Sequence, residues 1–412
     1  MARFLHTADL QLINSSPGDS EELRTRREAR LQTLETILKL AREEVVDFVL
    51  ICGDVFEDNC TSDVLIYKAL RLMQSVAPVP VLLLPGNHDP FNSGSVYRQP
   101  AFREDTGNVR VLTEPTPVVL PGGVALYPCP VTQRTSPLDP TGVIPPRESP
   151  AEIRIGLAHG SVAIESKYQD NDHPIGLDAA EVRGLDYLAL GHWHSKLILD
   201  GDRMAYPGTP EPTSFGETDS GNVLLVRIDT AGQKPQIETR TVSRLRWVDR
   251  VEQMSEPFED AVRRVRADLE GLPEHQRTLL RLTLQGALEA ESLARLGELE
   301  AWLQAAGLVR FQVRPQVHCR EEMHGALQRL AERDEVVAGT AADLRRLATL
   351  DNPEIAVASE VQPRPVEDLL GVWQARYQAK DGSTELGEDL TREQVAEEAL
   401  LVLSGFAQEV DR

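Results

Sequence analysis

The pattern of hydrophobic and polar positions over roughly the first 230 residues alternates between two periods. Short, nearly continuous apolar runs, typical of strands buried on both faces, alternate with stretches whose apolar residues recur every three or four positions, as in helices. This alternation predicts an α/β fold whose sheet is covered by helices or by a second sheet. The predicted strands are 3–8, 45–52, 79–84, 153–158 and 187–190, and the predicted helices are 23–40 and 64–73.

A second region begins at residue 244 and repeats the alternation on a smaller scale. It predicts a compact α+β domain of about 75 residues, an ordinary size for an accessory domain. Before it, the stretch 115–150 is rich in Pro and Gly, which predicts a short strand or two and a surface loop. In the second region a helix is predicted over 258–269, strands over 280–284 and 309–313, and one helix over 293–303 that Gly307 closes.

From residue 321 onward the pattern is helical and highly charged. Its last segment, 391–410, places Val395, Ala399, Leu403, Phe406 and Val410 on one stripe. Such a helix either packs on its own domain, which is the commoner case, or docks a partner. We therefore expect three domains, over 1–243, 244–320 and 321–412.

Five short polar motifs follow directly on apolar runs. The carboxyl ends of strands are where open α/β sheets place their ligand sites. The motifs consist mainly of residue types that bind hard or borderline metal ions, which predicts a two-metal hydrolytic site. They are Asp9-Leu10-Gln11, Gly53-Asp54, Gly86-Asn87-His88-Asp89, His159-Gly160 and Gly191-His192-Trp193-His194.

The third motif supplies candidates for proton transfer as well as for metal binding. His88 lies beside Asn87 and is not needed as a ligand, so it can protonate the leaving alkoxide. We expect Asp89 to orient the His88 imidazole, as carboxylates behind functional histidines do. In the second motif, the two oxygens of Asp54 can bridge two cations, and Gly53 lets the backbone turn tightly toward them.

Together the five motifs resemble those of the calcineurin-like metallophosphoesterase superfamily. Within it, the chain looks most like the Mre11/SbcD group of DNA repair exonucleases and its YhaO-type branch. The narrower likeness rests on the segments 4–9, 186–194 and 206–209, the last reading Tyr-Pro-Gly-Thr. The resemblance implies a layered β-sandwich flanked by helices, with a small α+β capping domain and a helical C-terminal region.

The resemblance also assigns roles to the residues of the motifs. It implies two divalent cations, usually manganese in relatives, and makes His88 the catalytic histidine. One cation would be held by Asp9, Gln11, Asp54 and His194, and the other by Asp54, Asn87, His159 and His192. Weaker candidates, for substrate contact, are Glu57, Tyr206, Gly208 and Thr209. Glu57 could equally open the next helix, and 206–209 could be only a turn before a strand.

The chain departs from the family pattern at Gln11, where relatives usually have histidine. An amide oxygen is a weaker ligand than imidazole for manganese or zinc, so the first cation site is expected to be weak. His6 cannot substitute, because in an extended strand it faces away from Asp9 and Gln11. His173, among polar neighbours, is expected to be solvent-exposed rather than catalytic.

The formal net charge of −22 disfavours a protein that grips nucleic acid with its whole surface. It does not exclude a nuclease, because local patches, bound cations or a partner can supply a positive field. The four cysteines form no C-x-x-C pair, which argues against a zinc knuckle or a disulfide frame. No apolar run could span a bilayer and a strand begins at once, so we expect no membrane association and a cytoplasmic protein.

The favoured hypothesis is therefore a manganese-dependent nuclease acting on DNA, an Mre11/SbcD-like subunit. The resemblance adds an SMC-like (Rad50-type) ATPase with long coiled coils as partner, and homodimerisation. Two alternatives stay open. One is a phosphodiesterase or pyrophosphatase acting on small nucleotides. The other, which Gln11 keeps open, is a weakly active regulatory or scaffold subunit.

Overall fold

The computed structural model describes residues 1–104, 106–148, 152–164, 171–272, 274–333 and 338–342, together with residues 399 and 403. The stripe predicted over 391–410 therefore lies outside the described residues, apart from those two positions. Within the described ranges, no helix has the length and apolar character needed to cross a membrane.

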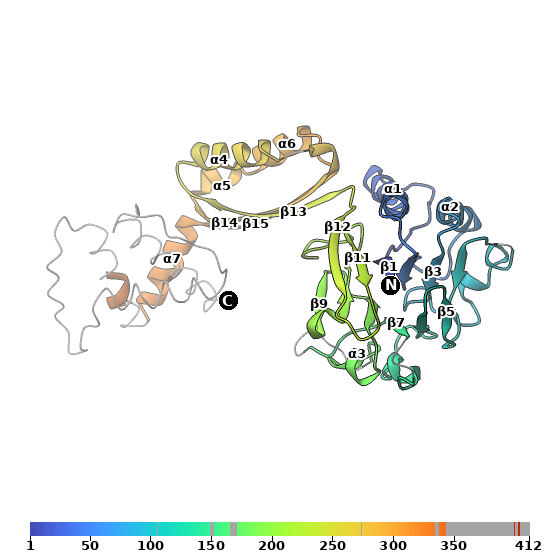
Figure 1. Cartoon of the computed structure of the whole chain (residues 1–412). Coiled ribbons are helices and arrows are strands. Elements are labelled where there is room, and N and C mark those ends of the chain that lie inside the picture. Colours follow the sequence, from blue (N-terminus) through green and yellow to red (C-terminus); the bar gives the residue numbers. More distant parts are fainter. Residues whose placement is uncertain are drawn as a thin grey trace, which may run out of the picture. The chain divides into compact units, whose positions relative to one another are not determined.

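The first sheet contains the strands that the sequence predicts closest to the N-terminus (Figure 1). Its order is β12-β11-β1-β2-β3-β4, with parallel pairing from β1 through β4 and antiparallel pairing of β1 with β11 and of β11 with β12. The strands are β1 (Ala2–Thr7), β2 (Phe48–Cys52), β3 (Val81–Leu84), β4 (Val109–Val111), β11 (Asn222–Ile228) and β12 (Gln236–Thr241).

The second sheet also has six strands, in the order β5-β6-β7-β8-β10-β9. Strands β6, β7, β8 and β10 run parallel, and β5 and β9 close the sheet as antiparallel edges. The strands are β5 (Val118–Leu120), β6 (Val124–Pro128), β7 (Ile153–His159), β8 (Tyr187–Gly191), β9 (Leu197–Leu199) and β10 (Met204–Tyr206).

The two sheets pack face to face, because strands β1, β2, β3 and β11 of the first sheet carry apolar side chains on both faces. In β2, Phe48 and Leu50 pack toward the second sheet, whereas Val49 and Ile51 pack toward the helices. Phe4 stacks on Phe48 with ring centroids 4.9 Å apart and meets the edge of Tyr187 from the second sheet at 5.7 Å. The layered β-sandwich that the resemblance implies is confirmed.

Helices α1 (Glu21–Glu43) and α2 (Asp63–Gln74) cover the outer face of the first sheet. Each begins at a serine whose side chain accepts a hydrogen bond from the third following amide, Ser20 for α1 and Ser62 for α2. Both helices enclose the ranges predicted for them. The short helix α3 (Ala179–Val182) packs on the outer face of the second sheet. Single 3₁₀ turns occur at Val96–Arg98, Pro100–Phe102, Pro140–Val143, Asp200–Asp202 and His275–Arg277.

The C-terminal half of the described chain contains a three-stranded sheet of order β13-β14-β15. One prediction here is wrong, because the single helix expected over 293–303 is two helices, with Gly297 opening the second. Glycine has the lowest helix propensity after proline, which explains the break. The elements are β13 (Arg246–Met254), α4 (Phe258–Glu270), β14 (Thr278–Leu288), α5 (Ala290–Ala294), α6 (Gly297–Ala305), β15 (Arg310–Cys319) and α7 (Arg320–Ala331).

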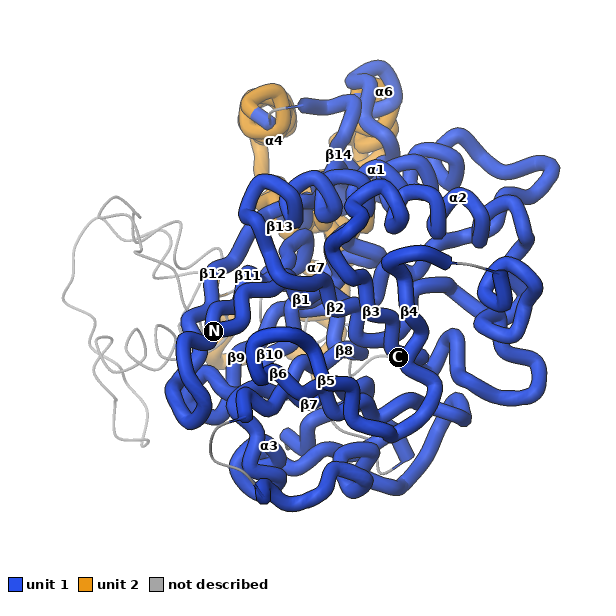
Figure 2. Tube along the Cα trace, turned by 45° about the vertical axis from the view of Figure 1, so that its right-hand side comes forward, with its two compact units in different colours: residues 1–250, 272–282, 303–312 blue, residues 251–271, 283–302, 313–412 orange. Residues whose placement is uncertain are grey.

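The chain forms two compact units, shown in different colours in Figure 2. The first comprises 1–250, 272–282 and 303–312, and the second comprises 251–271, 283–302 and 313–412. Both six-stranded sheets lie in the first unit. There the carboxyl ends of β1, β2, β3, β7 and β8 each lead directly into one of the five polar motifs.

Candidate metal centre

The loops that follow β1 and β2 run side by side and bring two carboxylates together. The amide of Asp9 donates to the carbonyl of Gly53 at 3.0 Å, and the amide of Gln11 donates to that of Asp54 at 2.9 Å. Asp9, Gln11 and Asp54 all have positive φ, at 55°, 43° and 52°. Each such residue costs about 1–3 kcal/mol and persists only where its surroundings fix it, as the paired loops do here.

Two glycines let the first and second sheets approach each other at the site. Gly53 has φ 93°, and a Cβ there would lie 2.0 Å from Nδ1 of His159. A Cβ on Gly191 would lie 1.8 Å from the carbonyl oxygen of Cys52. The prediction that Gly53 permits a tight turn at Asp54 is confirmed, and the same glycine also leaves room for His159.

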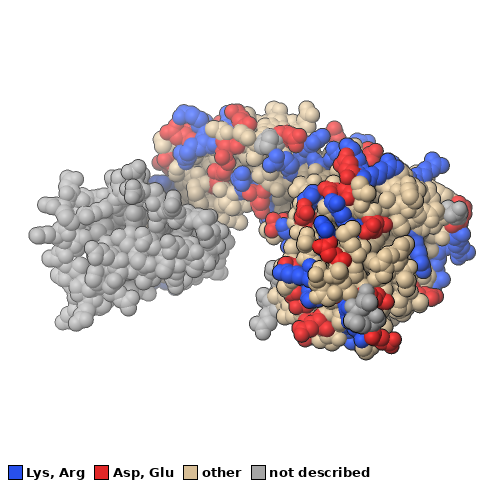
Figure 3. All heavy atoms as spheres, in the orientation of Figure 1, with Lys and Arg blue, Asp and Glu red and all other residues tan. Residues whose placement is uncertain are grey.

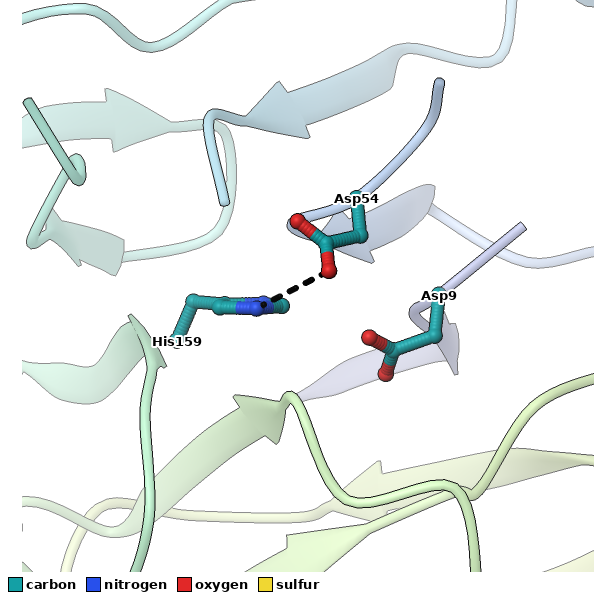
Figure 4. Close-up of side chains that lie close together, drawn as sticks. All are labelled: Asp9, Asp54 and His159. Atoms are coloured by element: carbon teal, nitrogen blue, oxygen red, sulfur yellow. Dashed lines mark ion pairs between the residues drawn. The ribbon is translucent and has the colours of Figure 1, made fainter. Parts of the chain in front are cut away.

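Three buried side chains form the centre of the site (Figure 4). Asp9, Asp54 and His159 are at most 1% exposed, and one possible ligand atom of each lies within 4.8 Å of the others. Within this group, Asp54 Oδ2 lies 3.4 Å from His159 Nε2. Two carboxylates and an imidazole at this spacing can hold a divalent cation.

Asn87 joins this group from the loop after β3. Its Oδ1 lies 2.8 Å from His159 Nε2 and 3.0 Å from His192 Nδ1. Ligand atoms that share one cation at about 2.1 Å are themselves about 3 Å apart, so these spacings suit a common ion. The backbone amide of His192 donates to Asp9 Oδ2 at 3.0 Å, which ties the last motif to the first.

Whether the residues fit a metal ion depends on which ring nitrogen of each histidine carries the proton. In both His159 and His192, the nitrogen that points away from Asn87, here called the outer nitrogen, faces an acceptor. His159 Nδ1 lies 2.9 Å from the carbonyl of Cys52, and His192 Nε2 lies 2.8 Å from Asp172 Oδ2. Carbonyls and carboxylates only accept, so the outer nitrogens carry the protons, and a neutral ring then turns a lone pair toward Asn87 Oδ1. The lone pairs of His159 Nε2 and His192 Nδ1 would then both face the oxygen of Asn87, which is also an acceptor. A cation between these atoms removes the mismatch. The residues therefore fit a metal ion.

Gln11 and His194 form the other side of the site. Gln11 is 4% exposed, and its amide nitrogen lies 3.2 Å from His194 Nε2. On the outer side of the ring, His194 Nδ1 lies 2.7 Å from Glu217 Oε1. The structure thus brings all seven predicted ligands together, with Gln11 where relatives of the resembled family have histidine.

The electrostatics of the centre favour a positive charge. Burial raises the pKa of Asp9. Burial alone would lower the pKa of His159, but Asp54 and Asp9 outweigh it and raise that pKa. Burial would raise the pKa of Asp54, and the interaction with His159 reverses this and lowers it. The carboxylates thus create a negative potential that attracts protons or cations.

Asp89 does not orient His88, which corrects the prediction. The buried Asp89 carboxylate accepts hydrogen bonds from the amides of Gly86, Phe56 and Asp54, at 2.8, 3.1 and 3.2 Å, and from the hydroxyl of Tyr97 at 2.6 Å. A buried carboxylate needs several donors, and the two adjacent loops supply them. Burial and the neighbouring Asp54 raise the pKa of Asp89 to about 6.

His88 is oriented by Glu57 instead. His88 Nδ1 lies 2.9 Å from the carbonyl oxygen of Glu57 and 3.9 Å from its carboxylate. Glu57 does not open the next helix, which begins at Asp63 after its own cap, Ser62. The carboxylate of Glu57 also forms an ion pair with the buried Arg30 at 3.5 Å.

The segment 206–209, predicted to contact substrate, is too buried to do so. Tyr206 is fully buried, where its hydroxyl donates to the carbonyl of Gly160 at 2.7 Å and accepts from the amide of Val162 at 2.9 Å. Thr209 is also fully buried, and Gly208 packs against the backbone of His194. Fully buried side chains cannot touch a substrate, so this segment shapes the site from behind.

Sequence reasoning missed three residues that support the site, namely Asp172, Glu217 and Arg30. Asp172 and Glu217 lie in polar loops 20 and 23 positions from the histidines they contact, so no local pattern marks them. Arg30 lies on a helix that is otherwise amphipathic, and the signal that could have found it is a charged residue on the apolar stripe. His173 is 4% exposed and packs near the carbonyl of Gln133, which corrects the expectation that it is exposed.

Comparison with known proteins agrees with this geometry. The family model of the calcineurin-like phosphoesterases matches residues 2–196. The uncharacterized metallophosphoesterase YhaO of Bacillus subtilis is 25% identical over 240 residues, covering 55% of this chain and 57% of that protein. DNA double-strand break repair proteins Mre11 are also similar. That of Methanopyrus kandleri is 26% identical over 64% of this chain and 62% of its own length. The Mre11 of Methanosarcina mazei is 25% identical, over 76% of this chain and 49% of its own length.

This chain thus spans between about half and three fifths of the length of these relatives. The matched residues 2–196 include every predicted metal ligand. Residues 2–196 thus match a calcineurin-like phosphoesterase domain, and the homologues of the chain include YhaO and Mre11, at modest identity.

Proposed function

We propose that this protein is a manganese-dependent phosphodiesterase that cleaves DNA at a two-cation centre. The observation that carries the proposal is the direction of three imidazoles. His159, His192 and His194 each have an acceptor behind the ring and one nitrogen turned toward the oxygen-bearing side chains of the first sheet. Asp9, Gln11, Asp54 and His194 would hold one cation, and Asp54, Asn87, His159 and His192 the other.

The chain itself provides the proton that the leaving group needs. When bound, two divalent cations polarise a phosphate and lower the pKa of a water that attacks in line. His88 Nδ1 faces the Glu57 carbonyl at 2.9 Å, so Nδ1 keeps its proton and Nε2 is the atom that can protonate the leaving alkoxide. The side chain of His88 is 25% exposed, which lets a substrate reach it.

DNA is proposed as the substrate because two of the relatives are DNA double-strand break repair proteins. The charge of the chain shapes how DNA would bind. The net charge is −22, and Lys and Arg side chains lie among Asp and Glu on the face shown in Figure 3. We therefore expect the isolated chain to bind DNA weakly, with an affinity that falls steeply as salt rises.

The proposal extends to the wider organisation of the protein. We propose a phosphoesterase domain over 1–243, a capping domain over 244–320 and a C-terminal region over 321–412 that docks a partner. The proposed partner is an SMC-like, Rad50-type ATPase with coiled coils. It would bind a homodimer of this chain, and the complex would act in the cytoplasm. Co-purification with such an ATPase, lost on removal of 321–412, is the test of this assembly.

The test of activity is cleavage of linear double-stranded DNA and of an aryl phosphodiester by the purified chain with Mn²⁺. Cleavage of both, abolished by EDTA and by Asp54→Ala but not by Asp58→Ala, is the expected result. Asp58 is an exposed acid four residues from Asp54 and serves as the matched control. Cleavage of the aryl ester alone would indicate a small-nucleotide substrate or the need for a partner that presents DNA.

One observation favours a second function, that of a weakly active scaffold subunit. Gln11 offers a neutral amide where relatives in the resembled family have imidazole. The variant Gln11→His separates the two functions. A strong rise in activity would show that the wild-type site is a degraded nuclease, whereas little change would show that glutamine is part of a working centre.

A further inference from the structure

The loop that follows β10 packs directly behind His194. The amide of Thr209 donates to the carbonyl of His194 at 3.0 Å, and the amide of Gly221 donates to the carbonyl of Thr209 at 2.7 Å. Gly208 has φ 75°, and a Cβ there would lie 2.7 Å from the carbonyl oxygen of His194. The loop and the last motif therefore form one rigid piece of backbone.

Glu217 lies at the centre of this loop, with a side chain that is only 8% exposed. Its Oε1 lies 2.7 Å from His194 Nδ1 and 3.0 Å from the hydroxyl of Ser214. Its Oε2 accepts from the amide of Thr213 at 2.7 Å and from the hydroxyl of Thr209 at 3.3 Å. The hydroxyl of Thr213 also donates to Oε1. A carboxylate has about four lone-pair sites, so this one is saturated and fixed in place.

A carboxylate in this position determines which nitrogen of His194 can bind a cation. Glu217 accepts the Nδ1 proton, so the lone pair of His194 is on Nε2, the nitrogen 3.2 Å from the amide of Gln11. A carboxylate behind an imidazole also raises its electron-donating strength as a ligand. Glu217 therefore both orients His194 and strengthens it.

The histidine on the other side of the centre has a looser support. His192 Nε2 lies 2.8 Å from Asp172 Oδ2, and the Asp172 side chain is 26% exposed; among the described residues it accepts one further hydrogen bond, from Ser161. Of these two carboxylates, the more rigidly held Glu217 thus stands behind the histidine whose neighbouring predicted ligand is the weak amide of Gln11. His192, by contrast, has Asn87 as its neighbouring predicted ligand, and Asp54 and His159 complete that side of the centre.

We propose that Glu217 is a positioning residue that compensates for Gln11, by making His194 a stronger and better oriented ligand for the cation on that side. The inference rests on the proposed two-cation centre. It assigns to the loop 207–221 the task of keeping a cation site functional although one imidazole ligand has been replaced by an amide.

The test is a titration of the full chain with Mn²⁺. Electron paramagnetic resonance measures the free ion during the titration, which gives the number of sites and their affinities. Glu217→Gln should weaken one site about 10- to 100-fold. The same substitution in a Gln11→His background should cost clearly less, because a second imidazole then supports the ion. Asp172→Asn is the matched control, and its cost should be the same in both backgrounds.

A second variant keeps the test decisive if Glu217→Gln does not fold. Ser214→Ala removes one hydroxyl that donates to the carboxylate but leaves the contact of Glu217 with His194, so it should weaken the same site by a smaller factor, about fivefold. Unchanged Mn²⁺ affinity in the folded variants, or equal cost of Glu217→Gln in both backgrounds, would overturn the inference. If wild-type protein binds no Mn²⁺, the two-cation centre itself fails.

Discussion

The two sheets contribute different proposed ligands to the centre and hold them by different means. The oxygen half, which comprises Asp9, Gln11, Asp54 and Asn87, comes from loops of the first sheet. Three of these four residues have positive φ, and backbone hydrogen bonds between neighbouring loops hold them. The imidazole half, which comprises His159, His192 and His194, comes from the second sheet, and each ring has its own acceptor behind it.

This difference predicts how each half responds to mutation. Changes beneath the oxygen half disturb backbone that several residues share, so they should cost stability and activity together. Substitution of Asp172 or Glu217 behind the imidazole half removes one acceptor from one ring, so it should alter metal affinity with little effect on folding.

The largest effect is expected for Asp54→Ala, which removes the carboxylate that both proposed cations share. The loss of several kcal/mol of transition-state stabilisation corresponds to a fall of about a thousandfold or more in turnover. Steady-state cleavage of an aryl phosphodiester measures it, with Asp58→Ala as the exposed control. Activity of Asp54→Ala within tenfold of wild type would contradict a shared carboxylate.

Asp89→Ala should break the oxygen half without removing a ligand. The substitution leaves the amides of Gly86, Phe56 and Asp54 without their acceptor in a buried place. At about 1–3 kcal/mol for each buried unsatisfied group, partly relieved by water, we expect a loss of about 3 kcal/mol in the free energy of unfolding. Urea denaturation measures it, and Asp172→Asn, behind the imidazole half, should change stability by less than about 0.5 kcal/mol.

Arg30→Met should weaken the same half from the helix side. Arg30 is 4% exposed, and it donates to the carbonyl of Gln11 and pairs with Glu57. The buried carbonyl loses its donor, whereas the pair with the 42% exposed Glu57 contributes little, so the expected loss is about 2 kcal/mol. An equal loss in Arg42→Met, an exposed residue of the same helix, would show that the effect is not specific to the site.

At neutral pH the smallest effect concerns His6, which connects the two sheets away from the proposed metal ligands. Burial lowers the pKa of His6 to about 3, and its nitrogens meet the hydroxyl of Tyr187 and the carbonyl of Leu190. Below about pH 6.5 the unfolded chain binds a proton that the folded chain does not, so stability falls by up to about 1.4 kcal/mol for each pH unit. His6→Gln should remove this part of the slope between about pH 6.5 and 4.5. Unfolding curves of both proteins with identical slopes would show that His6 does not titrate in this way.

Much of the first sheet could be predicted from the sequence because its strands are continuous apolar runs and its site residues follow them immediately. The proposed ligands Asp54 and Asn87 could be predicted for this reason, and so could the isolation of His6 from the centre. The residues that hold the proposed ligands in place could not be predicted, because their roles depend on tertiary contacts. Glu217 reaches back 23 residues across a loop, and Asp89 accepts from amides of a different strand end, which no local period encodes.

We propose that residues from both sheets hold two cations that share Asp54. Crystals of the full chain soaked in Mn²⁺, with anomalous diffraction at the manganese edge, test it most directly. We predict two peaks about 3.5–4 Å apart, one contacted by Gln11 and His194 and the other by Asn87, His159 and His192, with Asp54 between them. A single peak, or a pair that does not touch Asp54, would contradict the account.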